Sequence, residues 1–114
     1  MGFKIKIQGK NKFRSVIVNN VIGYIPGADP KLKEKSIILS AHIDHLGKNP
    51  SLSGDQIFNG AIDNSSAVTS MIITAKILKE YQKNLKYSII VLVCEAEEEG
   101  LLGLILFCKQ YRSL

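Results

Sequence analysis

Hydrophobic and polar residues alternate near the start of the chain, and this pattern predicts β-structure. Residues 3–8 (FKIKIQ) alternate with a period of two, which is typical of a half-exposed strand. Residues 14–25 are rich in β-forming side chains, and PGADP at 26–30 breaks the chain after them. We therefore predict an antiparallel edge hairpin over these two stretches, with Asn19-Asn20 as a turn or bulge.

Longer-range patterns predict an α/β unit. The short apolar runs at 36–41 and 87–94 favour buried strands by their length and isoleucine content. Apolar residues recur at helical spacing over 65–83, and 100–111 predicts a second helix that is apolar nearly all round. Residues 46–60 read as a long loop.

Strand, helix and strand over 36–94 predict one βαβ unit with parallel strands and a right-handed crossover. Ligands of such sheets bind outside the carboxyl ends of the strands. Three polar segments lie at these positions: AHIDHLG (41–47), NGAIDNSSA (59–67) and EAEEEGLLG (95–103). We expect all three to face one crevice.

Composition excludes several classes of protein. With 114 residues, 46% of them apolar, one globular domain is expected. The net charge of +5 comes from scattered lysines, which is poor evidence for a nucleic-acid site. Cys94 and Cys108 are expected to be buried thiols, because a disulfide framework needs more cysteines. No secretory signal and no apolar run of the ~20 residues needed for a membrane span is visible, and the compartment stays open.

The first polar segment offers metal-ligand chemistry. His42 and Asp44 point to one side if the strand continues through them. Neutral imidazole is a good zinc ligand, and a carboxylate can accept its other ring N–H. The alternative is that both residues merely end a strand. His45 is a weaker candidate, because Leu46-Gly47 suggests that the chain is already turning away.

The other two segments supply carboxylates. Asp63 is either a helix cap or, since Asn64 and Ser65 are good capping residues themselves, a free carboxylate that can bridge two cations. Glu97, Glu98 and Glu99 follow a strand directly, with Glu95 just before them. They either complement the dipole of the next helix or hold a cation that relieves their repulsion. Together, the three segments suit a metal-assisted hydrolytic centre.

The residues from Asn20 to Gly103 resemble the zinc aminopeptidases of metallopeptidase family 28, which includes bacterial leucyl aminopeptidases and relatives of glutamate carboxypeptidase. The matching segments are NVIGYIPGADPKLKEKSIILSAHIDHLG, GDQIFNGAIDNSSAV and CEAEEEGLLG. The resemblance implies an α/β fold of the phosphorylase/hydrolase-like, three-layer type with a mixed sheet. It also implies a site for two zinc ions, a peptide substrate, and relatives that are often secreted or periplasmic.

The resemblance also implies a role for each motif residue. His42 and Glu98 match zinc ligands, Asp63 matches the aspartate that bridges the two zinc ions, and Asp44 matches the residue that orients the histidine. Glu97 matches the general base. The reaction implied is removal of an N-terminal amino acid, with a zinc-bound water attacking the peptide bond while Glu97 shuttles its proton.

Two departures from the family pattern matter. Ile62 stands where relatives usually carry an acidic residue. No Asp, Glu or His follows Glu99, although the family takes an aspartate and a histidine ligand from later strands. We therefore expect a partial catalytic domain that stops after the second helix, is weak or inactive alone, and associates through that apolar helix. The alternative is a catalytically inactive relative that acts as a binding or structural fragment.

Overall fold

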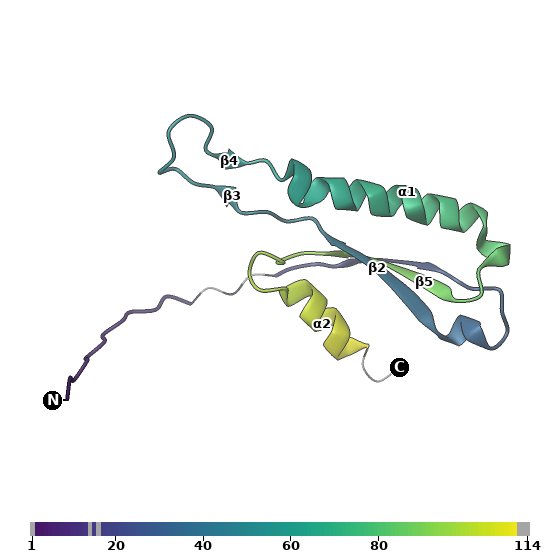
Figure 1. Cartoon of the computed structure of the whole chain (residues 1–114), viewed down its shortest axis with the longest axis horizontal. Helices are drawn as coiled ribbons and strands as arrows, with labels where there is room; N and C mark the ends of the chain where they lie inside the picture. The colour runs from purple at the N-terminus through teal and green to yellow at the C-terminus, as the bar shows by residue number, and fades with distance from the viewer. Residues whose placement is uncertain (1, 14, 16, 112–114) are drawn as a thin grey trace.

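A three-stranded mixed sheet forms the centre of the molecule (Figure 1). The computed structural model describes residues 2–13, 15 and 17–111. Strand β5 (Ser88–Cys94) lies between β1 (Val21–Ile25), to which it runs antiparallel, and β2 (Ser36–His42), to which it runs parallel. The mixed sheet and the parallel pairing of the two predicted apolar strands are therefore confirmed.

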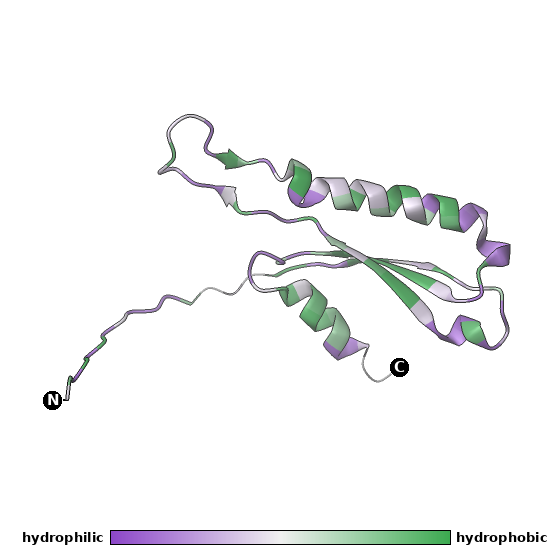
Figure 2. Ribbon diagram, in the orientation of Figure 1, coloured by the Kyte–Doolittle hydropathy of each residue, from purple (hydrophilic) through white to green (hydrophobic). Residues whose placement is uncertain are grey.

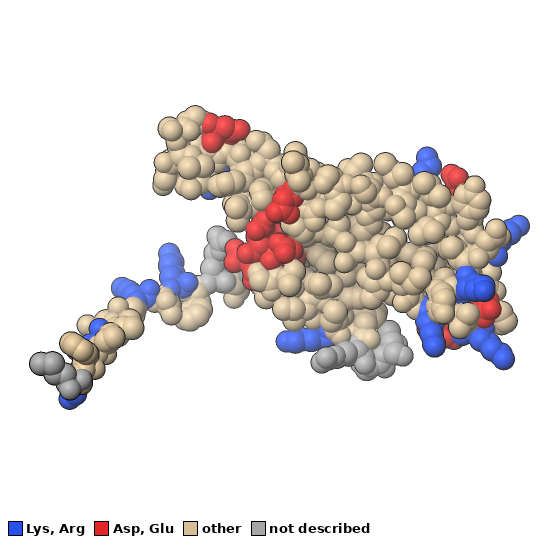
Figure 3. Space-filling model, viewed as in Figure 1, with Lys and Arg blue, Asp and Glu red and all other residues tan. Residues whose placement is uncertain are grey.

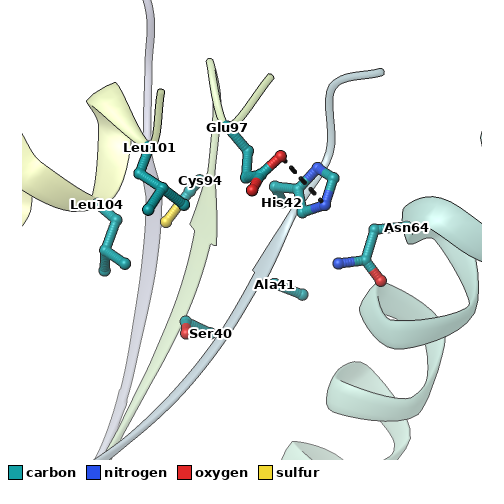
Figure 4. A pocket seen from close by; sticks show the side chains of 8 residues that line it. All are labelled: Ser40, Ala41, His42, Asn64, Cys94, Glu97, Leu101 and Leu104. Atoms are coloured by element: carbon teal, nitrogen blue, oxygen red, sulfur yellow. Dashed lines mark ion pairs between the residues drawn. The ribbon is translucent and has the colours of Figure 1, made fainter. Parts of the chain in front are cut away.

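Two helices lie on opposite sides of this sheet (Figures 1 and 4). Helix α1 (Ala67–Glu80) connects β2 to β5 and packs mainly on β2, and α2 (Leu102–Gln110) follows β5. Both helices were predicted. No described helix combines the length and the apolar character that crossing a bilayer requires.

Shorter elements join these parts. An irregular helical turn (Ala61–Ser66) precedes α1, and single 3-10 turns cover Leu32–Glu34 and Gln82–Asn84. The long loop predicted over 46–60 contains a small antiparallel pair, β3 (Gly47–Lys48) with β4 (Ile57–Phe58). This pair folds the loop back toward the start of α1.

The core lies between β5 and α2. Leu92, Cys94 and Phe107 are buried against one another, with Ile90 and Leu104 packed around them. At the start of β5 the fully buried Ser88 hydroxyl donates to the Lys33 carbonyl (2.7 Å) and accepts from the Gly27 amide (3.0 Å). A buried hydroxyl is stable only when it is hydrogen-bonded, so these contacts fix where β5 enters the sheet.

The predicted N-terminal hairpin is wrong. Residues 2–13 form no strand, and Phe3, Ile5 and Ile7 are almost fully exposed. Residues 14 and 16 lie outside the described part of the chain. Strand β1 pairs with β5 instead, because period-two alternation sets which face a side chain occupies but not which strand becomes the partner.

The sequence also predicted more burial for β2 and α2 than the structure shows. Strand β2 is an edge strand of the described sheet, so Ile37 and Ile38 are about half exposed and burial is confined to its last residues. Figure 2 shows α2 as apolar along most of its length, yet only Gly103 and Phe107 are buried there. Cys108, which lies on this helix, is exposed, unlike Cys94.

Replacing Leu92 with alanine should destabilise the protein by about 2–5 kcal/mol, because a fully buried side chain would leave a cavity against Phe107. Urea unfolding followed by circular dichroism would measure this. The matched control is Leu106→Ala on the exposed side of α2, which should change stability by about 0.5 kcal/mol or less. Equal losses in the two variants would contradict the placement of the core.

Candidate metal centre

The candidate site lies where β2 and β5 end side by side. In this parallel pair His42 is in register with Cys94, and the Ile43 amide still donates to the Cys94 carbonyl at 2.9 Å. Residues 42–45 and 95–98 therefore leave the sheet at the same end, where the carboxyl ends of β2 and β5 lie side by side. The irregular turn before α1 brings Asp63 over that end, so the three predicted segments do meet.

Asp63 faces the sheet because the turn around it is not helical. Its backbone (φ −113°, ψ 88°) interrupts the turn Ala61–Ser66, and its Oδ1 lies 3.0 Å from Nε2 of His42. No side chain caps α1, so the capping roles considered for Asp63, Asn64 and Ser65 are all wrong. The carboxylate of Asp63 is thus free for another role.

His42 is buried and held in one tautomer. Its Nδ1 must donate to the main-chain carbonyl of Asp44 (3.0 Å), because a carbonyl oxygen only accepts. In the neutral ring Nε2 then carries a lone pair, and it faces carboxylate oxygens of Asp63 (3.0 Å) and Glu97 (3.8 Å). A lone pair facing carboxylates is favourable only with a cation between them, either a proton or a metal ion.

Asp44 contacts the site through both its main-chain carbonyl, which accepts from His42, and its carboxylate. Its carboxylate Oδ1 lies 3.8 Å from Nδ1 of His42, and its Oδ2 accepts a hydrogen bond from the Glu98 amide at 3.2 Å. Oδ1 is buried, and among the described residues it has no hydrogen-bond partner. Asp44 therefore links the end of β2 to the turn that carries Glu97 and Glu98.

The acidic turn after β5 precedes α2 and is not part of it. Helix α2 begins at Leu102 and has no acidic residue in its first turn, so these glutamates do not complement its dipole as the alternative supposed. Gly103 lets the helix approach, because a Cβ there would collide with the Glu95 carbonyl oxygen. Asn20, expected in a turn or bulge, instead donates to the Gly103 carbonyl at 2.8 Å and helps to hold this junction.

His45 joins the site, although its sequence position argued against it. Its Nδ1 lies 2.6 Å from Oε1 of Glu98. Ligand atoms of His45, Asp63 and Glu98 all lie within 4.8 Å of one another. On a continuing strand, His42 and His45 would point to opposite faces, but β2 ends at His42 and the chain then follows an irregular path.

The local charge also fits a cation. Asp44, Asp63, Glu97 and Glu98 gather at one edge, and within the described ranges their close ion-pair partners are histidines. Figure 3 shows the acidic side chains between the start of α1 and the turn after β5. Crowded carboxylates repel one another, and a divalent cation removes that conflict. Imidazole nitrogens and carboxylate oxygens are donors that zinc accepts.

The comparison with protein families agrees with this geometry. The family model of peptidase family M28 matches residues 20–113. The chain belongs to peptidase family M28. Members of this family are peptidases and generally depend on zinc, which is the ion that the donor set suits. Searches of the curated proteins and of the solved structures found no match.

Beside the candidate metal centre of this M28 chain lies a small pocket of about 170 Å³ (Figure 4). His42, Asn64 and Glu97 give it a polar side, and Cys94, Leu101 and Leu104 give it an apolar one. Burial raises the pKa of the Cys94 thiol, and negative charge at Cys108 and Asp44 adds to the shift. Cys94 is therefore a neutral packing group at physiological pH and a poor nucleophile.

The two thiols of this M28 chain should react at different rates. At pH 8 an aromatic disulfide reagent should modify the exposed Cys108 rapidly, whereas Cys94 should react only after guanidinium unfolding, because it is buried and its pKa is raised. Absorbance of the released thiolate would give the two rates. In Cys108→Ser the rapid phase should vanish, and two equally rapid phases in the unmodified protein would contradict the burial of Cys94.

Proposed function

We propose that this M28 chain carries the metal-binding part of an aminopeptidase, built on the phosphorylase/hydrolase-like α/β fold. One observation carries the proposal: Nε2 of His42 lies 3.0 Å from a carboxylate oxygen of Asp63 and 3.8 Å from one of Glu97, where the two parallel strands end. His42, Asp63 and Glu98 are the proposed zinc ligands: Asp63 Oδ1 lies 3.0 Å from His42 Nε2, and ligand atoms of Asp63 and Glu98 lie within 4.8 Å of each other. Asp44 is the proposed orienting residue.

Glu97 is the proposed general base. Zinc, when bound, lowers the pKa of a coordinated water and polarises a carbonyl group. Glu97 is only partly exposed, and its Oε2 lies 3.8 Å from His42 Nε2, close to the ligand atoms but farther than Asp63. From there its carboxylate can take a proton from the attacking water and return it to the leaving amine.

The aminopeptidase assignment rests on the resemblance of AHIDHLG, NGAIDNSSA and EAEEEGLLG to the zinc aminopeptidases of this family. The carboxylates themselves do not select the substrate, because a bound cation offsets their charge.

The alternative, a chain that binds metal without catalysis, rests on the small number of metal-ligating side chains. Both histidines of the chain stand at positions 42 and 45, and no Asp, Glu or His follows Glu99. Ile62, next to Asp63, is exposed and adds no charge. Each cation would therefore have few protein ligands from this chain, which predicts weak turnover. Zinc binding without any peptide hydrolysis would favour the binding-only role.

Zinc binding tests the ligand assignment. The folded chain should take up zinc and lose it to a chelator, and either His42→Ala or Asp63→Ala should weaken binding by at least about tenfold. Competition against a chromophoric chelator would measure the affinities. Asp55→Ala, which removes an exposed carboxylate from the loop before β4, is the matched control and should bind normally. A folded sample with no zinc above background would refute the proposal.

Glu97→Gln should lower the hydrolysis of an aminoacyl nitroanilide by about 10²- to 10⁴-fold without changing zinc affinity, because the amide keeps the shape of the side chain but accepts no proton. The rate should be measured with saturating zinc, together with its loss on adding chelator. Glu99→Gln neutralises the neighbouring glutamate and should keep the starting rate. Equal activity in the Glu97 variant and the unmodified chain would rule out its role as base.

A further inference from the structure

We propose that His45 is a further metal ligand, which holds a zinc-type divalent cation together with Asp63 and Glu98. This position lies beside the one at which His42 and Asp63 meet. The inference rests on the proposed function, because both positions use the same carboxylates. It adds a histidine that the family motif does not assign to the metal.

The distances among His45, Asp63 and Glu98 are the first support for a shared metal ion. The ligand atoms of His45, Asp63 and Glu98 lie within 4.8 Å of one another, and the closest pair, His45 Nδ1 and Glu98 Oε1, is 2.6 Å apart. Bonds of about 2.0–2.2 Å in a tetrahedral zinc site separate the ligand atoms by roughly 3.3–3.6 Å. The 2.6 Å pair is shorter than this value and the 4.8 Å limit is longer, so binding one cation requires the side chains of His45 and Glu98 to move apart.

The surroundings of His45 hold its ring in place. The edge-to-face contact with Phe58 of β4 has a centroid distance of 6.0 Å. Gly60 lies against it from the loop side, where an added Cβ would come within 3.3 Å of the His45 Cβ. Gly60 also has a φ of 64°, which favours glycine. The fold-back of loop 46–60 thus orients the imidazole before any ligand arrives.

Asp63 can serve both positions. Its Oδ1 is 3.0 Å from Nε2 of His42, and it also belongs to the cluster with His45 and Glu98. Its side chain is two-thirds exposed, with a relative accessibility of 66%, and so has room to bind through both oxygens. Each histidine then pairs with one side of a shared carboxylate. Two cations offset the repulsion among the four carboxylates better than one.

A simple hydrogen bond is the competing explanation for His45. In that case Nδ1–H donates to Glu98 and only orients this carboxylate. The two explanations predict different metal binding by the variant His45→Asn. The asparagine amide can still donate to Glu98 from a similar position, but it is a poor zinc ligand.

The test titrates the metal-free 114-residue chain with Zn²⁺ by calorimetry and with Co²⁺ by visible absorption. The unmodified chain, His45→Ala, His45→Asn and His42→Ala would be compared, with circular dichroism melting of each metal-free form as the folding control. We expect both His45 variants to bind one metal ion fewer than the unmodified chain and to lose the Co²⁺ absorption band of that ion. His42→Ala should instead lose the other metal ion.

Metal binding by His45→Asn that equals the unmodified chain would overturn the proposal, because a hydrogen bond would then be sufficient. If His45→Ala does not fold, His45→Asn alone decides. Binding that depends on His42 but not on His45 would refute this inference and leave the proposed function standing. An unmodified chain that binds no metal would refute both.

Discussion

The parallel pairing of β2 with β5 is the constraint on which the rest of the structure depends. It runs in register from Ser36 with Ser88 to His42 with Cys94. Because both strands end at the same edge, side chains more than fifty positions apart in sequence, such as His45 and Glu98, come into hydrogen-bonding distance. The crossover through α1 is required by this pairing, since parallel strands cannot be joined by a tight turn.

Burial along the sheet follows the same geometry. The first residues of β2 are exposed, whereas its last two, Ala41 and His42, are buried next to Cys94. The buried end of β2 is therefore the end that carries the candidate metal ligand His42. Elsewhere the described residues leave apolar side chains half exposed on both helices, including Ile72 and Ile77 on α1 and Leu106 on α2.

The electrostatics of this end of the sheet favour the binding of a cation. The Asp44 carbonyl accepts from Nδ1 of His42, and this contact turns Nε2 toward the carboxylates of Asp63 and Glu97. A divalent cation would offset the repulsion among these carboxylates, and this is the basis of the zinc site proposed for this M28 chain. The shared position of Asp63 between two histidines connects the proposed catalytic role with the proposed second ligand set.

The sequence by itself determined the parallel βαβ unit, the two helices and the family, because periodicity and short motifs are local properties. It also identified His42, Asp63, Glu97 and Glu98 as residues that meet. Only the tertiary structure decided that β1 pairs with β5, that β2 lies at an edge, and that His45 belongs to the site. Each of these depends on which distant segment becomes a neighbour and on where a strand stops. Side-chain direction beyond the end of β2 is set by contacts with Phe58, Gly60 and Glu98, which no local pattern records.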